Sequence, residues 1–174
     1  VGFQALYNTT SNYNTAFGYQ AGYSNTTGAY NTITGHQALY GNTTGSYNVI
    51  SGYGAGSAGS NNVAIGSLAL TQNTANNNTA VGYQAGYSNT TGVLEAFGAY
   101  ALSSNTTGNY CKAFGESALR SNTTGNSNNA FGGSALRSNT TASDNSAFGE
   151  SALRSNTTGA SNTALGSQSL YSNT

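Results

Sequence analysis

Two stretches decide the fold of this chain: NTAFGYQAGYSNTTG at residues 14–28 and NTAVGYQAGYSNTTG at residues 78–92. They differ at one position only, and working outward from them the same pattern recurs along all 174 residues. Each copy has a glycine directly after the strand-like T-A-F segment or its equivalent. These anchor glycines are Gly2, Gly18, Gly35, Gly52, Gly66, Gly82, Gly98, Gly115, Gly132, Gly149 and Gly166. They are 16 or 17 residues apart, except for one 14-residue interval from Gly52 to Gly66, so the chain is expected to stack repeated coils.

The composition favours strands over helices. Asn, Thr, Ser and Gly make up more than half of the chain and Pro is absent, so no 16-residue unit offers a good helix-forming stretch. The N-T-T-G segment has the residues of a turn, because Asn and Gly tolerate positive φ. We therefore expect an all-β fold, a parallel β-solenoid (β-roll) of about eleven coils of 16–17 residues. Each coil would carry two short strands, near T-A-F-G and A-L-Y-S, and the rod would be about 50 Å long at about 4.8 Å per coil.

The columns of equivalent residues predict how the coils pack. The residue before each anchor glycine is mostly Phe, Val, Ile or Leu, which suggests a core column. Two columns of Ala suggest close backbone approach. Because each coil supplies few large apolar side chains, we expect burial against other copies, in a homotrimer or an end-to-end filament, helped by Asn ladders and stacked Tyr rings. Both ends of the sequence fall inside a repeat, so residues 1–174 are interpreted as one repeat array excerpted from a longer fibre.

All eight charged residues lie between Glu95 and Arg154. Three arginines occupy the same column as several tyrosines, and this Tyr/Arg ridge is a candidate ligand-binding surface for glycans. Its candidate residues are Tyr23, Tyr40, Tyr87, Arg120, Arg137 and Arg154. The alternative is that Glu116 and Glu150 neutralise the arginine row within or between chains.

Several functions are not expected. One Lys and three Arg are too few for a nucleic-acid partner, and no apolar run approaches the roughly 18 residues needed for membrane insertion. Glu116 and Glu150 would be about 9.6 Å apart, at the far edge of inverting glycosidase geometry, but a flat ladder offers no pocket. His36 replaces Tyr in an aromatic column and Cys111 is solitary. We therefore expect no enzyme activity, no metal and no cofactor.

The N-T-T segments also form N-x-T sequons, which are possible glycosylation sites in a glycosylating host. They begin at Asn25, Asn42, Asn89, Asn105, Asn122, Asn139 and Asn156. In a host without that machinery they would serve as turn and ladder residues.

Finally, SAGSNNVAIG at residues 57–66 resembles the head repeats of trimeric autotransporter adhesins. The two 15-residue stretches quoted first are similar to N-T-A-x-G-Y-Q-A-L-Y-S-N-T-T-G arrays of bacterial surface and phage tail-fibre proteins. This resemblance implies a non-catalytic fibre or adhesin stalk, extracellular, on a cell surface or on a virion, with itself as partner. Host or matrix glycans are a possible second partner, and ice binding is a further alternative. Val93-Leu94-Glu95 and Cys111-Lys112 depart from the pattern.

Overall fold

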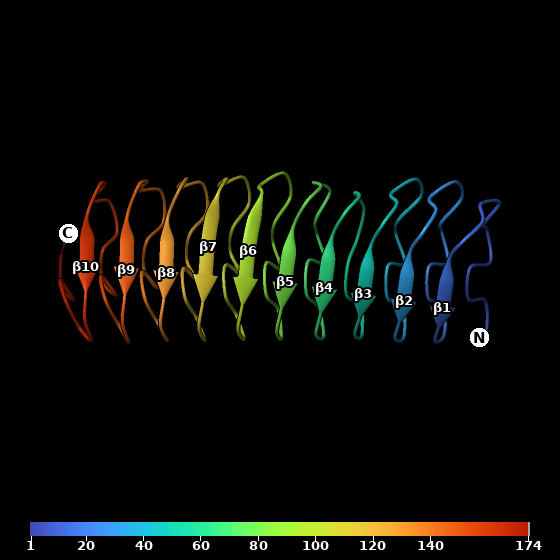
Figure 1. Cartoon of the computed structure of the whole chain (residues 1–174), viewed down its shortest axis with the longest axis horizontal. Coiled ribbons are helices and arrows are strands. Elements are labelled where there is room, and N and C mark those ends of the chain that lie inside the picture. Colours follow the sequence, from blue (N-terminus) through green and yellow to red (C-terminus); the bar gives the residue numbers. More distant parts are fainter. Residues whose placement is uncertain (174) are drawn as a thin grey trace.

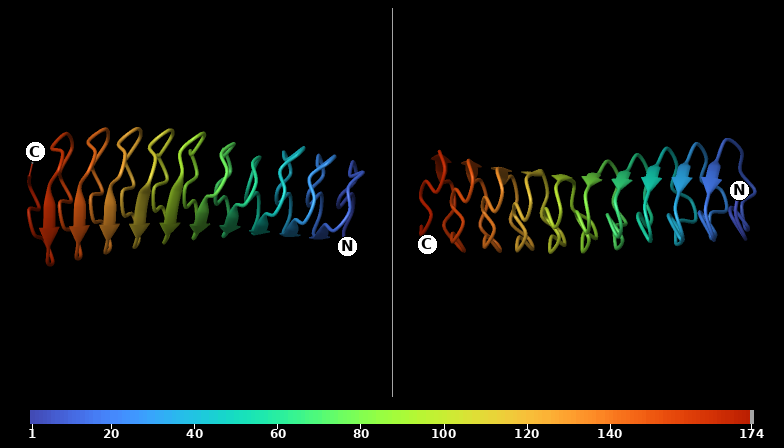
Figure 2. Two further views of the ribbon diagram at one scale, coloured as in Figure 1. Left: turned by 45° about the horizontal axis from the view of Figure 1, so that its top comes forward. Right: turned by 90° about the horizontal axis from the view of Figure 1, so that it is seen from below.

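The computed structural model describes residues 1–173 and shows an elongated rod of stacked coils (Figure 1). Ten strands lie side by side in chain order and form one parallel sheet. Figure 2 shows the strands along one side of the rod and the turns on its other sides. The strands are β1 (Thr15–Phe17), β2 (Thr32–Thr34), β3 (Val49–Ser51), β4 (Val63–Ile65), β5 (Thr79–Val81), β6 (Leu94–Phe97), β7 (Cys111–Phe114), β8 (Asn129–Phe131), β9 (Ser146–Phe148) and β10 (Thr163–Leu165).

The register follows the repeat throughout. The middle residue of each strand pairs with the middle residue of the next, as Ala16 does with Ile33 and Ala130 with Ala147. Residues 1–173 contain no helix, and the predicted all-β parallel solenoid is confirmed. The first repeat copy contributes turns but no strand.

Each coil has one strand, where two were expected. The A-L-Y-S segment forms consecutive turns, because the second and fourth residues after each anchor glycine have positive φ, as in Ser117 (58°) and Leu119 (50°). A positive φ at the third residue of a turn is the type II signature. The turns are closed by Ala118 N donating to Gly115 O at 3.2 Å and by Arg120 N donating to Ser117 O at 3.3 Å. The second strand was predicted wrongly because a short apolar run such as A-L-Y is consistent with a buried strand when periodicity alone is considered.

Leucine in the left-handed region is unusual, since this conformation costs an L-residue about 1–2 kcal/mol. Leu119 is fully buried, and burying a Leu side chain contributes about 1.5–3 kcal/mol. Its backbone N–H also donates to Ala135 O of the next coil at 3.0 Å. Burial and hydrogen bonding together offset the strain at Leu119.

The core lies inside the individual coils. Ala113, Ala118 and Leu119 are each 0% exposed, and the same three columns are buried in nearly every coil. The Ala columns thus allow close approach within one chain, and they present no surface to a second chain. This corrects the expectation that they pack between copies.

The residues before the anchor glycines are a second correction. Phe17 is 62% exposed and Leu165 is 80% exposed, so this column lies outside the core. Side chains alternate across a strand, and the buried Ala in the middle of each strand directs its two neighbours outward. We call this set the outer apolar column: Phe17, Ile65, Val81, Phe97, Phe114, Phe131, Phe148 and Leu165.

Core volume is conserved between neighbouring coils. Gly56 takes the place of the buried Leu, and a Cβ on it would lie 2.9 Å from Cδ1 of Ile50. Gly86 is likewise filled from both sides, with Leu70 Cδ2 at 2.9 Å and Leu94 Cδ1 at 3.4 Å from such a Cβ. Large side chains of adjacent coils therefore occupy the space that these glycines leave.

Two internal columns of asparagine tie the coils together, which confirms the expected Asn ladders. The first contains the Asn of each N-T-T turn; Asn122 Nδ2 donates to Asn105 Oδ1 and to Gly125 O, both at 2.9 Å. The second lies just before the strands; Asn48 donates to Asn31 Oδ1 from its backbone N at 3.0 Å and from Nδ2 at 2.9 Å. Asn122 thus satisfies a backbone carbonyl of its own turn and also bonds to the neighbouring coil. In the second column the amides bond to neighbouring coils, and Asn145 Nδ2 is buried without a hydrogen-bond partner among residues 1–173.

Candidate binding surface

The tyrosines at the start of the Tyr/Arg ridge form a stack. Tyr7, Tyr23 and Tyr40 have ring centroids 5.5 and 5.2 Å apart and interplanar angles of 5° and 6°. The predicted stacking of Tyr rings is therefore confirmed. Tyr87 lies further along the same column and is half-buried. A row of parallel rings at one coil spacing is a geometry that contributes stacking energy beyond simple burial.

The arginines of the ridge turn toward tyrosines. The guanidinium carbon of Arg120 lies 5.0 Å from the ring centroid of Tyr100, and that of Arg154 lies 5.5 Å from Tyr171. Arg154 Nη1 also donates to the hydroxyl of Tyr171. Arg137 is half-buried between them in the column. These contacts orient the guanidinium groups of Arg120 and Arg154, and both residues are half-buried.

Within residues 1–173, no glutamate forms an ion pair with the arginine row, so the alternative of neutralisation by Glu116 and Glu150 inside one chain is not observed. Across residues 1–173 one ion pair forms, between Lys112 Nζ and Glu95 Oε1 at 3.6 Å. Glu150 instead extends over Gly133, so that a Cβ on this glycine would lie 2.7 Å from Glu150 Oε2. The space that Gly133 leaves between Glu116 and Glu150 in their column is therefore occupied by the Glu150 carboxylate.

The sequon asparagines are buried. All seven candidates, Asn25 to Asn156, are 0% exposed. Nδ2, the atom that would carry a glycan, donates two hydrogen bonds in Asn139, to Asn122 Oδ1 and to Ala142 O, each at 2.9 Å. A glycan on these atoms is incompatible with the folded coil, so these residues act as ladder residues.

Cys111 and His36 both substitute for the residue type of their column. Cys111 stands in the second asparagine column, the one just before the strands, and its Sγ donates to Gly125 O at 3.2 Å. The burial of Cys111 raises the pKa of its thiol. His36 stacks between Tyr19 and Tyr53, with centroid distances of 5.0 and 5.3 Å. Residues 1–173 hold no group of three or more His, Cys, Asp or Glu side chains that could bind a metal ion.

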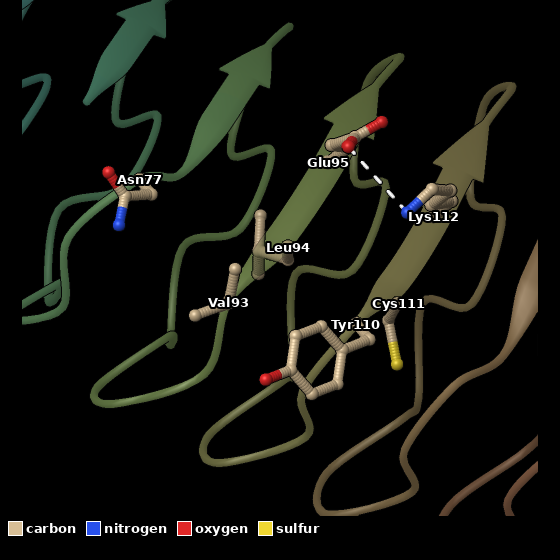
Figure 3. Close-up of a pocket in the computed structure, with 7 residues that line it drawn as sticks. All are labelled: Asn77, Val93, Leu94, Glu95, Tyr110, Cys111 and Lys112. Carbon is tan, nitrogen blue, oxygen red and sulfur yellow. Dashed lines mark ion pairs between the residues drawn. The ribbon is translucent and has the colours of Figure 1, made fainter. Parts of the chain in front are cut away.

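A small hollow lies where the sequence departs from the repeat (Figure 3). It has a volume of about 90 Å³, far below the roughly 300 Å³ at which small-molecule pockets begin. The ion pair between Glu95 and Lys112 crosses its rim. The hollow is lined by Asn77, Val93, Leu94, Glu95, Tyr110, Cys111 and Lys112. It is therefore a surface feature of β6 and β7 rather than a ligand site.

The outer face of the sheet is the surface that sequence reasoning missed. Its phenylalanines form a second stack: the centroids of Phe97, Phe114, Phe131 and Phe148 are 4.7, 4.8 and 5.0 Å apart. The signal that could have located them is the constant Ala one residue earlier, because only one of two adjacent strand residues can point inward.

The geometry does not supply a flat threonine lattice. On the outer sheet face, the pattern T-x-T occurs in β2 alone among the ten strands. The first hydroxyl of an N-T-T turn bonds to the next coil, since Thr26 Oγ1 donates to Thr43 O at 2.9 Å and Thr106 Oγ1 to Thr123 O at 3.0 Å. The second threonine of each turn is exposed, but these residues form a single row along a turn. A single row is not the flat two-dimensional lattice that ice binding uses, and we do not propose that activity.

Comparison with known proteins found no matching family model, no matching curated protein and no matching solved structure. Within residues 1–173, no helix is long and apolar enough to cross a membrane.

Proposed function

We propose that this chain is a structural segment of an extracellular or cell-surface fibre, acting through its length and stiffness and through self-association. The observation that carries the proposal is the uninterrupted ten-strand sheet, in which each strand pairs only with its neighbours in the sequence. Nine steps of about 4.8 Å place β10 about 43 Å from β1. The asparagine columns run along the same axis and link most pairs of neighbouring coils by hydrogen bonds, with breaks at the short coil in the first column and at Leu94 and Cys111 in the second.

Self-association is supported by the outer apolar column. The column is unbroken from Ile65 to Leu165. Ile65 and Phe148 are each 40% exposed and Leu165 is 80% exposed, and the four members between Ile65 and Phe148 are half-buried. Exposed apolar side chains in a continuous row mark association surfaces more often than isolated ones do. A second copy placed against this face buries the phenylalanine stack of both chains, which is consistent with a homotrimer or with a laterally assembled filament.

The first experiment is cryo-electron microscopy of the assembled protein, with sedimentation to give the number of subunits. The test variant is Phe114→Thr/Phe131→Thr, because Thr34 already occupies this column and Thr is a good strand former. The matched control is Tyr13→Thr/Tyr30→Thr, which removes an exposed stacked pair 4.9 Å apart that lies off the strands. We expect discrete rods or filaments from the native chain and the control, and dissociation in the phenylalanine variant. Monomeric native protein, or equal assembly of all three, would refute self-association through this face.

A second candidate function is recognition of anionic glycans by the arginine part of the ridge. The observation in its favour is that Arg120 and Arg154 stack on tyrosines while forming no ion pair with a carboxylate within residues 1–173. A glycan array would compare the native chain with the triple variant Arg120→Ala/Arg137→Ala/Arg154→Ala. Binding of sulfated or sialylated glycans that is retained in the triple variant would exclude the arginine row.

A further inference from the structure

The 14-residue coil between Gly52 and Gly66 opens a slot in the side of the rod. This coil is two or three residues shorter than every other, and a hollow of about 390 Å³ lies beside it. That volume falls within the roughly 300–1,000 Å³ of small-molecule sites. The slot is lined by Gln37, Tyr40, Ser57 and Thr71 together with three glycines.

The tyrosine stack of the ridge ends at this slot. Tyr40 is covered on one ring face by Tyr23, and the next two members of its column are the small residues Ser57 and Thr71. The following ring is that of Tyr87, three coils and about 14 Å away. The second face of Tyr40 is thus unstacked, and its side chain is 39% exposed.

A row of glutamines ends at the same place. Gln20 Nε2 donates to Gln4 Oε1 at 2.9 Å, and Gln37 Nε2 donates to Gln20 Oε1 at 3.0 Å. The equivalent residue in the next coil is Gly54, so the row has no further amide to donate to Gln37 Oε1. Gln37 lines the slot, and the Oε1 of each earlier member of this row accepts from the following coil.

The remaining polar groups of the slot are hydroxyls. Thr71 Oγ1 donates to Gly54 O at 3.1 Å and keeps its lone pairs as acceptors. Ser57 adds a second hydroxyl. No lining residue is charged, and a charged ligand would lose hydration there without gaining an opposite charge.

We propose that this slot binds a neutral pyranose, stacked by its C–H face on Tyr40 and hydrogen-bonded through its hydroxyls to Gln37, Ser57 and Thr71. A sugar ring combines an apolar face with a rim of donors and acceptors, as these lining groups require. Tyr40 belongs to the tyrosine part of the ridge, but the slot holds none of the three arginines and no member of the outer apolar column. The inference is therefore independent of self-association and of the arginine part of the ridge.

The test is a titration of the ¹⁵N-labelled full chain with methyl pyranosides of glucose, galactose, mannose and N-acetylglucosamine. Two variants challenge the site. Tyr40→Ala removes the stacking face, and Ser57→Tyr continues the tyrosine column into the slot and fills it. Two matched controls are Tyr7→Ala, at the far end of the same stack, and Ser103→Tyr, in the same column but outside the slot.

We expect at least one pyranoside to shift the backbone amides of Gly54 and Gly56. Both test variants should lose about tenfold or more in affinity, the value of one good aromatic contact, and both controls should bind as the native chain does. The Ser57→Tyr variant keeps every existing ring in place and therefore tests the slot even if Tyr40→Ala disturbs the fold. The proposal is overturned if none of the four pyranosides binds, if Ser57→Tyr binds like the native chain, or if adenosine or sialic acid occupies the slot in their place.

Discussion

The asparagine ladders make a sharp prediction at Asn122, in the middle of the rod. Its side chain is 0% exposed and donates to Asn105 Oδ1 and Gly125 O, both at 2.9 Å. It also accepts from Asn139 Nδ2 at 2.9 Å. Replacement by Ala leaves the Asn105 oxygen and one hydrogen of the Asn139 amide without partners, while Gly125 O keeps only the thiol of Cys111.

The magnitude follows from these orphaned groups. Each buried polar group left unsatisfied costs about 1–3 kcal/mol, and the cavity left by the amide adds to that loss. We therefore expect Asn122→Ala to destabilise the central coils by about 3–5 kcal/mol. The matched control is Asn8→Ala, because Asn8 is exposed and makes one side-chain bond, to Tyr23 O at 3.0 Å.

The assay is native-state hydrogen exchange, since each coil contacts only its neighbours and the loss should be local. Amides of β7 and β8 should exchange at least about a hundredfold faster in Asn122→Ala, from 1.4 kcal/mol per factor of ten, while those of β2 keep their protection. Asn8→Ala should leave β7 and β8 unchanged. If Asn122→Ala and Asn8→Ala gave the same exchange rates in β7 and β8, the ladder would not contribute the stability argued here.

Three further predictions concern other contacts. Gly115→Ala should disrupt its coil by about 3 kcal/mol or more, because φ is 142° and the new Cβ would lie 2.5 Å from the carbonyl oxygen of the next anchor glycine; Gly166→Ala, with nothing within 4 Å, should retain a higher urea midpoint. Burial raises the pKa of the Cys111 thiol, so the folded state holds this proton above about pH 8.5, where the unfolded thiol loses it. Stability should then fall with rising pH above that value in the native chain more steeply than in Cys111→Ala, as measured by urea unfolding from pH 7 to 9.5, and equal slopes would contradict this. Finally, Glu95→Ala should lower stability by no more than about 0.5 kcal/mol, since the Glu95 and Lys112 side chains are 48% and 42% exposed; a loss above 1.5 kcal/mol would show a larger role for the pair.

The repeat period predicted the solenoid because a constant spacing forces equivalent residues into columns, whatever the local conformation of each coil. Local conformation was harder to predict. Leu119 has a positive φ, which propensity rules assign to Gly or Asn. The stack of coils makes this conformation favourable by burying the side chain, and that contribution is invisible in a single 17-residue unit.

The direction of the strand side chains was also ambiguous from sequence. Ala113 and Phe114 are adjacent in β7, and transfer free energy alone favours burying Phe. The interior has room for the smaller residue, because neighbouring coils already fill it with Leu119 and its equivalents. Phe114 is therefore placed outside, where it stacks on Phe97 and Phe131. Packing between coils, rather than hydrophobicity of one residue, decided the outcome.

The candidate sites differ in how far sequence could locate them. Arg120 and Tyr40 are each the fifth residue after an anchor glycine, so the repeat spacing alone predicts that they share one column, and they do so in the structure. The burial of the sequon asparagines does not follow from counting, because an N-x-T motif has the same letters whether its amide is inside or outside the coil. The slot beside Tyr40 depends on the shortened coil, which the spacing reveals, and on the free ring face, which only the structure shows.

The buried columns stay nearly the same from coil to coil, while the exposed side chains change along the rod. The surface is therefore divided into zones of different chemistry. The stacks that begin at Phe3, Tyr7 and Tyr13 end at Tyr53, Tyr40 and Tyr47, at or just before the short coil. Charged residues and the long phenylalanine stack begin only after residue 94. Because each coil bonds only to its neighbours, such a change of decoration requires no adjustment elsewhere. One rod can therefore carry a neutral, aromatic ligand slot beside its short coil and a phenylalanine stack for association in the coils after residue 94, so a variant in one zone should leave the activity of the other intact.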